Sequence, residues 1–214
     1  MTFAVGIFDL FSYTIPGSLY LAFFGYLATR LHWIDPGAVG RAPVLLLVIV
    51  IVVASYLLGY LAYPLGAMAK RVLPQRRIRR PREEFLHRNP AASGRDYVHA
   101  DPFLLLSAVE LHNKEVAAEV TRLRASGLML RNSAPPLLLG AAAAIVELVL
   151  GRNPVFMAGS ALLLVAGFCS LIVQGRRLGH WASLKTLELC FWLPDIDEKC
   201  RLAEHAKNPD VTRG

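Results

Sequence analysis

The chain has 214 residues, of which 55% are hydrophobic and 18% are charged. A soluble domain is about 45–50% apolar and about 25% charged, so this composition argues against a soluble protein and favours a membrane protein. The formal net charge of +7 raises nucleic acid as a partner. Basic residues that flank membrane helices and meet anionic lipid head groups explain the charge better, so we expect lipid rather than nucleic acid.

Four apolar runs divide the chain, and the basic residues lie almost entirely on one side of them. Of the 23 Lys and Arg residues, thirteen lie between the second and third runs and seven follow the fourth. Cytoplasmic loops retain Lys and Arg, so the pattern predicts a multi-pass protein of the bacterial inner membrane with both termini in the cytoplasm. The expected fold is an all-α integral membrane protein with four transmembrane helices.

The N-terminal segment, residues 1–69, is expected to hold a short interfacial helix and the first two spans. Apolar residues recur at helical spacing over residues 3–14, which is typical of a helix that lies in the membrane interface. Pro16-Gly17 would end this helix near the start of a first span at residues 15–30. The alternative is that residues 3–14 simply begin the first span.

The second span, at about residues 43–69, starts with a uniformly apolar run and then changes character. Tyr56, Tyr60 and Tyr63 are spaced four and three, so they share one helical face, and Pro64 should kink the helix. The tyrosine face is a candidate lining for a ligand site or an aqueous path. Tyrosines near the end of a span also serve as interface anchors or packing residues, and this alternative stays open.

Residues 70–100 are expected to form a basic cytoplasmic connector. Prolines and like charges oppose a packed core, so the part after Pro74 is predicted to be extended and to lie against lipid head groups. The predicted head-group contacts are Lys70, Arg71, Arg76, Arg77, Arg79 and Arg80.

Residues 101–133 are predicted to form one amphipathic cytoplasmic helix. Asp101 is a good N-cap, and Pro102 is favourable in the first turn. A second amphipathic helix is expected in the tail, residues 175–214, and is the natural partner for the first. The apolar stripe that would be buried between them consists of Leu105, Val109, Val116, Val120 and Leu123.

Residues 134–174 are expected to form a transmembrane hairpin of spans three and four. Pro135-Pro136 should bend or restart the helix where it enters the membrane. Small side chains let neighbouring helices approach closely. The predicted helix–helix contacts of this kind are Gly140, Ala144, Gly159 and Gly167.

The sequence offers little chemistry. It contains no Gly-rich phosphate loop, nucleophile elbow or zinc-protease motif, and we predict no catalytic residue, no cofactor and no metal site. Glu147 is the one charge well inside a span, which makes it a candidate for a membrane path. The alternative is that it reaches outer water or pairs with Arg152, which is close to the same end of the span.

Two segments carry a resemblance to other proteins: FDLFSYTIPGSLYLAFFGY at residues 8–26 and RLRASGLMLRNSAPP at residues 122–136. They resemble small, uncharacterised prokaryotic multi-span membrane proteins that accompany anti-phage defence or signalling modules. The resemblance implies that such proteins can form oligomers and act on the membrane barrier. It carries over no functional residue.

These patterns favour a non-enzymatic, homo-oligomeric inner-membrane protein. Its cytoplasmic helices would bind or sense a protein partner and alter the membrane part, as a pore-forming or membrane-perturbing effector. One alternative is a scaffold or accessory subunit of a membrane complex. Another is a membrane-bound enzyme that acts on a lipid, for which the interfacial polar candidates are His87, His99, Asp96, Asp101 and Glu110.

Overall fold

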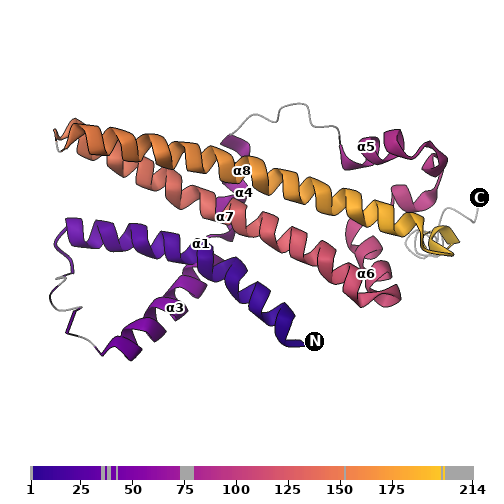
Figure 1. Cartoon of the computed structure of the whole chain (residues 1–214), viewed down its shortest axis with the longest axis horizontal. Coiled ribbons are helices and arrows are strands. Elements are labelled where there is room, and N and C mark those ends of the chain that lie inside the picture. Colours follow the sequence, from indigo (N-terminus) through magenta and orange to yellow (C-terminus); the bar gives the residue numbers. More distant parts are fainter. Residues whose placement is uncertain are drawn as a thin grey trace, which may run out of the picture. The chain divides into compact units, whose positions relative to one another are not determined.

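The computed structural model describes residues 2–34, 37, 40–41, 43–72, 80–151, 153–198 and 200, with the side chains of residues 2–9 and 70–72 left out. This part of the chain is helical and contains no strand (Figure 1). The α-helices are α1 (Thr2–Arg30), α3 (Val44–Leu61), α4 (Tyr63–Val72), α5 (Pro81–Arg88), α6 (Pro102–His112), α7 (Lys114–Val149) and α8 (Pro154–Phe191), with 3-10 turns η1 (Pro90–Ala92) and η2 (Asp96–Val98).

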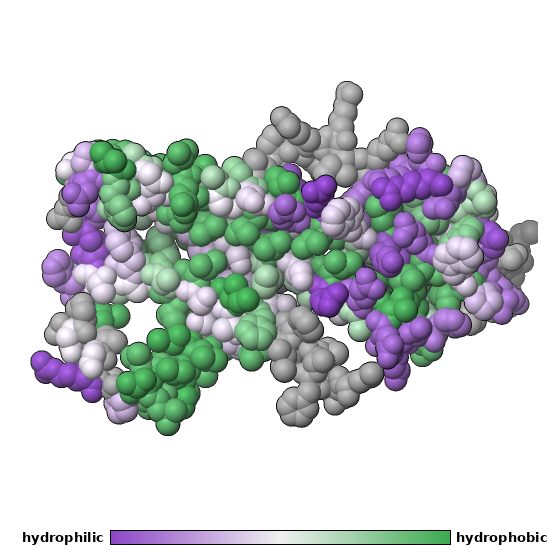
Figure 2. Space-filling view, in the orientation of Figure 1, coloured by the Kyte–Doolittle hydropathy of each residue, from purple (hydrophilic) through white to green (hydrophobic). Residues whose placement is uncertain are grey.

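Two compact units make up the chain. The apolar unit comprises residues 1–74 and 125–177, and the polar unit comprises residues 75–124 and 178–214. In Figure 2, hydrophobic side chains cover α3 and hydrophilic ones gather over α5 and α6. Three helices in the described part are long and apolar enough to cross a membrane, namely α3, α7 and α8. The expectation of a membrane protein is therefore supported.

The N-terminal segment forms one helix, which corrects the prediction of a separate interfacial helix. α1 continues through Pro16, so residues 3–14 are the first part of a longer helix and not a separate one. Proline removes one backbone N–H, and tertiary packing can hold the helix across that gap. Packing is tight at this point, because a Cβ added to Gly17 would lie 1.6 Å from the carbonyl oxygen of Ser55.

α1 and α3 meet in Figure 1, and a glycine of each helix lies at the crossing. A Cβ on Gly59 would lie 1.9 Å from the carbonyl oxygen of Tyr13, so both helices need glycine where their backbones meet. Ser55 is buried in the same crossing. Such close backbone approach is the packing that small residues permit between membrane helices.

The second apolar segment is divided, as its proline predicted. α3 ends at Leu61, and α4 begins at Tyr63 after a turn at Ala62. Pro64 has no N–H to donate to the carbonyl of Tyr60, so the regular helical pattern is interrupted there. The expected kink near Pro64 is confirmed.

The helices do not break at the boundaries predicted at residues 133 and 175. α7 passes through both Pro135 and Pro136, and α8 runs without a break to Phe191. No new helix starts at the prolines, because α7 is packed on both sides of them. Ala134 and Phe168 belong to the core of the apolar unit. A Cβ on Gly175 would lie 3.1 Å from the carbonyl oxygen of Gly127.

The actual helix break lies at Asn113, inside the helix predicted over residues 101–133. Its backbone is extended, with φ −150° and ψ 104°. Its Oδ1 accepts hydrogen bonds from the backbone N–H groups of Glu115 at 3.0 Å and Val116 at 3.3 Å. Asn113 therefore caps the start of α7. Asp101 caps α6 as predicted, with Oδ1 2.7 Å from the Phe103 nitrogen.

Candidate functional site

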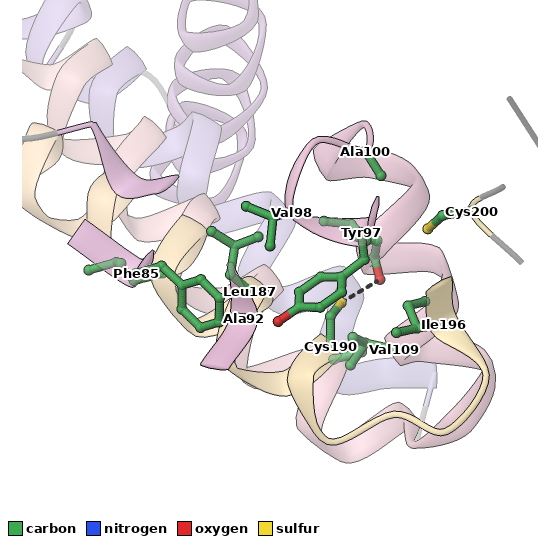
Figure 3. Close-up of a cluster of buried hydrophobic side chains, with 13 residues drawn as sticks. Phe85, Ala92, Tyr97, Val98, Ala100, Val109, Leu187, Cys190, Ile196 and Cys200 are labelled. Atoms are coloured by element: carbon green, nitrogen blue, oxygen red, sulfur yellow. Dashed lines mark hydrogen bonds between the residues drawn. The ribbon is translucent and has the colours of Figure 1, made fainter. Parts of the chain in front are cut away.

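The core of the polar unit joins three segments of the chain (Figure 3). α6 contributes Leu105 and Val109, and α8 contributes Leu187 and Cys190. The thiol of Cys190 donates to the carbonyl oxygen of Leu105 at 3.8 Å. The tail thus packs on α6. Within the predicted stripe, Leu105, Val109 and Val120 are buried, whereas Val116 and Leu123 are half-buried.

The third segment of this core comes from the basic connector, which corrects the prediction that it is extended. Phe85 and Tyr97 are almost fully buried, and their ring centroids lie 6.4 Å apart in an edge-on arrangement. Burial raises the pKa of Tyr97 to about 12. The prediction rested on the prolines and the like charges, which oppose a packed core. A few well-spaced apolar residues are nevertheless enough to bury part of the segment in the core. Prolines are also compatible with short helices, since Pro81 and Pro90 stand at helix starts.

Polar contacts, including an ion pair, hold the connector to the tail. Glu84 Oε2 lies 2.6 Å from His180 Nε2, and Glu84 also pairs with Arg88. Arg95 Nη1 lies 2.7 Å from Asp197 Oδ2. The hydrogen bond from His180 is the main reason that the pKa of Glu84 is below its usual value. The connector is therefore held to α8 by burial and by charge.

Among the described residues of the polar unit, Leu104 and Leu111 of α6 and Trp192 after α8 are exposed, and we call these residues the α6 surface. Leu111 is 90% exposed and Trp192 is 81% exposed. α6 buries one apolar face in the core and presents Leu104 and Leu111 on another. Exposed apolar patches on folded proteins commonly mark interaction sites. A pocket on this surface is lined by Ala108, Leu111, His112, Leu193, Pro194, Asp195 and Ile196.

The predicted tyrosine face is divided between two contacts. The ring of Tyr13 lies 5.9 Å from that of Tyr56 and 5.7 Å from that of Tyr60, measured between centroids. Tyr63 instead lies under Arg131, with the guanidinium carbon 5.3 Å from the ring centroid. These contacts fit the packing alternative for Tyr56 and Tyr60. Tyr63 differs from the other two tyrosines because its ring contacts a cation and not another ring.

Glu147 is buried in the apolar unit and has partners that the sequence reading missed. Its Oε1 lies 2.6 Å from Arg30 Nε and accepts a hydrogen bond from the Tyr26 hydroxyl at 3.2 Å. The expected partner, Arg152, lies outside the described residues. Tyr26 and Arg30 are four residues apart at the end of α1, so their spacing on one helical face was the available signal.

Of the four predicted small-residue contacts, two glycines lie between α7 and α8, the alanine is buried, and one glycine makes no close contact. A Cβ on Gly167 would lie 3.2 Å from Leu137, and one on Gly140 would lie 3.4 Å from Leu164, so both glycines lie where α7 and α8 pack. Ala144 is buried. Gly159 has no atom of the described chain within 4 Å of an added Cβ, so it makes no close contact of this kind.

Most predicted head-group contacts lie outside the described side chains. This applies to Lys70, Arg71, Arg76, Arg77 and Arg79. Arg80 is described and exposed, immediately before α5. Its backbone N–H donates to Glu83 Oε2 at 3.4 Å, so this residue has a role in starting the helix.

The candidates for lipid chemistry have structural roles or lie on the surface. Asp101 caps α6, and the carbonyl oxygen of His99 accepts from Arg82 at 3.3 Å. His87 and Glu110 are exposed, and Asp96 lies in η2. Within the described residues, no group of three or more His, Cys, Asp or Glu side chains could hold a metal ion.

Membrane-length apolar helices joined to a folded, charged helical unit define the class as a membrane protein with a substantial polar part. Comparison with known proteins adds no narrower class, since no family model, curated protein or solved structure matches the chain.

Proposed function

We propose that this chain is an oligomeric inner-membrane protein that binds a protein partner through its polar unit and responds in its apolar unit. The observation that carries the proposal is the continuity of α7 and α8. Each helix supplies residues to both units. A displacement of the helix in one unit would therefore also displace the residues that it contributes to the other unit. Such rigid elements can carry a conformational change if they have two arrangements.

Packing within each unit supports this role for the long helices. In the polar unit, Val120 of α7 and Leu187 of α8 are buried. In the apolar unit, Ala134 of α7 and Phe168 of α8 are buried in one cluster. Because protein interiors are closely packed, a displaced helix moves its neighbours rather than sliding freely.

The α6 surface is the proposed site for the partner. Its exposed Leu111 and Trp192 provide apolar and aromatic contact area next to a pocket, which is the composition of a protein-binding site. The proposed partner is therefore a cytoplasmic protein that inserts an apolar side chain into this pocket.

The proposed topology has four spans and cytoplasmic ends. α1 is the fourth span, in addition to the three helices of sufficient length and hydropathy. Arg30 at the end of α1 pairs with Glu147 near the end of α7, so an ion pair would join the two spans close to the outer surface. The basic residues after α4 and α8 support a cytoplasmic placement of the polar unit.

The proposed outcome of partner binding is a change in membrane permeability, in line with the resemblance to membrane proteins of defence modules. The test is dye leakage from vesicles that contain the full chain, with cytoplasmic extract of the host cell as the source of partner. Native mass spectrometry of the same preparation gives the oligomeric state. A monomer would overturn the oligomer claim.

A helix break between the units tests the coupling. Ala125 lies in α7 where the chain passes from the polar to the apolar unit. Ala125→Pro should abolish leakage while leaving the oligomer intact, because proline removes a helical hydrogen bond at a cost of about 3 kcal/mol. Ala125→Leu keeps the helix and serves as the control. Equal leakage from both variants would contradict the coupling.

The second candidate is a scaffold or accessory subunit, favoured by the same α6 surface. It predicts a stoichiometric partner that co-purifies with the full chain and no leakage under any condition. Leu111→Glu should then remove the partner without changing the membrane insertion of the protein.

A further inference from the structure

We propose that the apolar unit contains a phosphate-binding site in which Arg131 of α7 is the recognition residue. Its guanidinium atoms Nε and Nη2 are shielded from solvent and have no hydrogen-bond partner among the described residues. A buried cationic donor without an acceptor is costly, so an acceptor is expected on this side of the group. The inference does not depend on the proposed partner or on the leakage activity.

The two unsatisfied nitrogens define the shape of the ligand. Nε–H and one N–H of Nη2 point in the same direction along one edge of the planar guanidinium group. This edge is a fork that binds two oxygens of a carboxylate or phosphate at once. The missing acceptor is therefore an oxyanion rather than a single carbonyl oxygen.

Neighbouring residues make this region a polar layer between α4 and α7. The side chain of Asn132 is buried, and its Oδ1 has no donor in the described part of the chain. A Cβ on Gly66 of α4 would lie 2.1 Å from that Oδ1, so α4 has room for Asn132 only because position 66 is glycine. Ser133 Oγ is likewise buried and without a partner there. Hydrogen-bonding capacity is thus concentrated on three consecutive residues.

The prolines of α7 add to this layer. Pro135 and Pro136 have no N–H, so the carbonyl groups of Arg131 and Asn132 lack their usual helical donors. A ligand that combines an oxyanion with hydroxyl or amine donors would satisfy both kinds of group. A phosphate ester with a polar head group has this chemistry.

Tyr63 forms the rim of the site. Its ring lies against the guanidinium group and is 47% exposed, so it can turn aside and admit a ligand from outside the unit. Among the described residues of the apolar unit, Glu147 is the one buried carboxylate, and it pairs with Arg30. The proposed oxyanion is therefore supplied by another molecule. The phosphate of a surrounding lipid is the favoured source, and a soluble phosphate is the other.

The test is ligand titration of the full chain in mild detergent, read by native mass spectrometry. The probes are a phosphatidylglycerol, the matching diacylglycerol without phosphate, glycerol phosphate and inorganic phosphate. A lipid site predicts binding of phosphatidylglycerol alone. Equal binding of glycerol phosphate would assign the site to a soluble ligand. Equal binding of diacylglycerol would overturn it, because the phosphate would then contribute nothing.

Variants decide whether Arg131 is the recognition residue. Arg131→Gln should weaken phosphate-dependent binding about tenfold, as expected for loss of a charge-assisted bidentate contact. Arg122→Gln removes the same charge from an exposed position of α7 and should have no effect. Equal binding by these two variants would overturn the proposal.

A second variant covers the case in which Arg131→Gln does not fold. Arg131→Lys keeps the charge and most of the volume but loses the two-pronged edge. It should bind phosphatidylglycerol several-fold more weakly than the parent while showing the same elution volume and thermal midpoint. Unchanged affinity in this variant would show that the fork is not used.

Discussion

Glu84 of α5 and His180 of α8 are joined by a hydrogen bond in the polar unit, with 2.6 Å between Oε2 and Nε2. The pair joins a segment of the connector to the tail, although 96 positions separate the two residues in the sequence. Beside it, Phe85 enters the core. The pair therefore lies at the edge of the contact through which the connector folds onto α8.

Acid should weaken this contact. The pKa of Glu84 is lower in the folded chain than in the unfolded chain, mainly because His180 donates to it. A lowered carboxyl pKa contributes stability that is present above the unfolded value, about 4.3, and is lost as the pH falls through the folded pKa. We expect the thermal midpoint of the polar unit to fall as the pH drops from about 5 to about 3.

Glu84→Gln isolates the contribution of this carboxyl group. The variant should unfold at a lower temperature than the parent at pH 6, and the difference between the two should shrink toward pH 3. Other carboxyl groups titrate in both proteins and cancel in the comparison. A difference that stays constant over this range would show that the ionised carboxylate of Glu84 does not stabilise the unit.

The crossing of α1 and α3 gives a prediction about glycine. Gly17→Ala should destabilise the apolar unit by about 1–3 kcal/mol, because the added Cβ would overlap the backbone of Ser55. Gly25→Ala is the matched control in the same helix, since nothing lies within 4 Å of its added Cβ. It should be neutral or slightly stabilising, because alanine is the better helix former.

The readout for both glycine variants is the thermal midpoint in detergent, together with cysteine cross-linking between α1 and α3. Loss of stability in Gly25→Ala as large as that in Gly17→Ala would contradict the close crossing.

Much of the helical content could be predicted from the sequence, since apolar runs and the Asp101-Pro102 cap act locally. The errors arose where tertiary packing outweighs a local signal. Pro135 and Pro136 are strong helix breakers in isolation, but packing on both sides of them carries α7 through. The break lies at Asn113, where a side chain replaces the missing helical acceptors. Asparagine is common in helices and in caps, so its role depended on the fold.

The sites were predicted less well because they depend on residues that are distant in the sequence. Glu147 was identified as a rare buried charge, but Arg30 could be recognised as its partner only once α1 was placed beside α7. Arg131 was counted among the many basic residues of its loop. Its distinctive property is that two of its nitrogens are buried without an acceptor. Neither the composition nor the spacing of residues in a sequence shows which atoms of a side chain are buried.

The effects of Glu147 and Arg30 on the free energy of unfolding should not be additive, because the two side chains interact. Glu147→Ala would leave Arg30 without its carboxylate partner in the apolar unit, and we expect a lower thermal midpoint. The double variant with Arg30→Met should lose less than the sum of the two single changes, since neither charge is then left alone. The measurement is a double-mutant cycle on thermal unfolding in detergent. Additive losses would mean that the two side chains do not interact.

The connector offers the sharpest test of the polar unit, because an extended segment and a packed one respond differently to the same change. Phe85 is 1% exposed, so Phe85→Ala should cost about 3–5 kcal/mol and release the connector from α8. Phe103 is 76% exposed, and Phe103→Ala should cost far less. Limited proteolysis between residues 80 and 100 is the readout. Rapid cleavage in Phe85→Ala, with protection in Phe103→Ala and the parent, is expected. Equal cleavage in all three proteins would show that the basic segment is extended in solution, as its charge alone predicts.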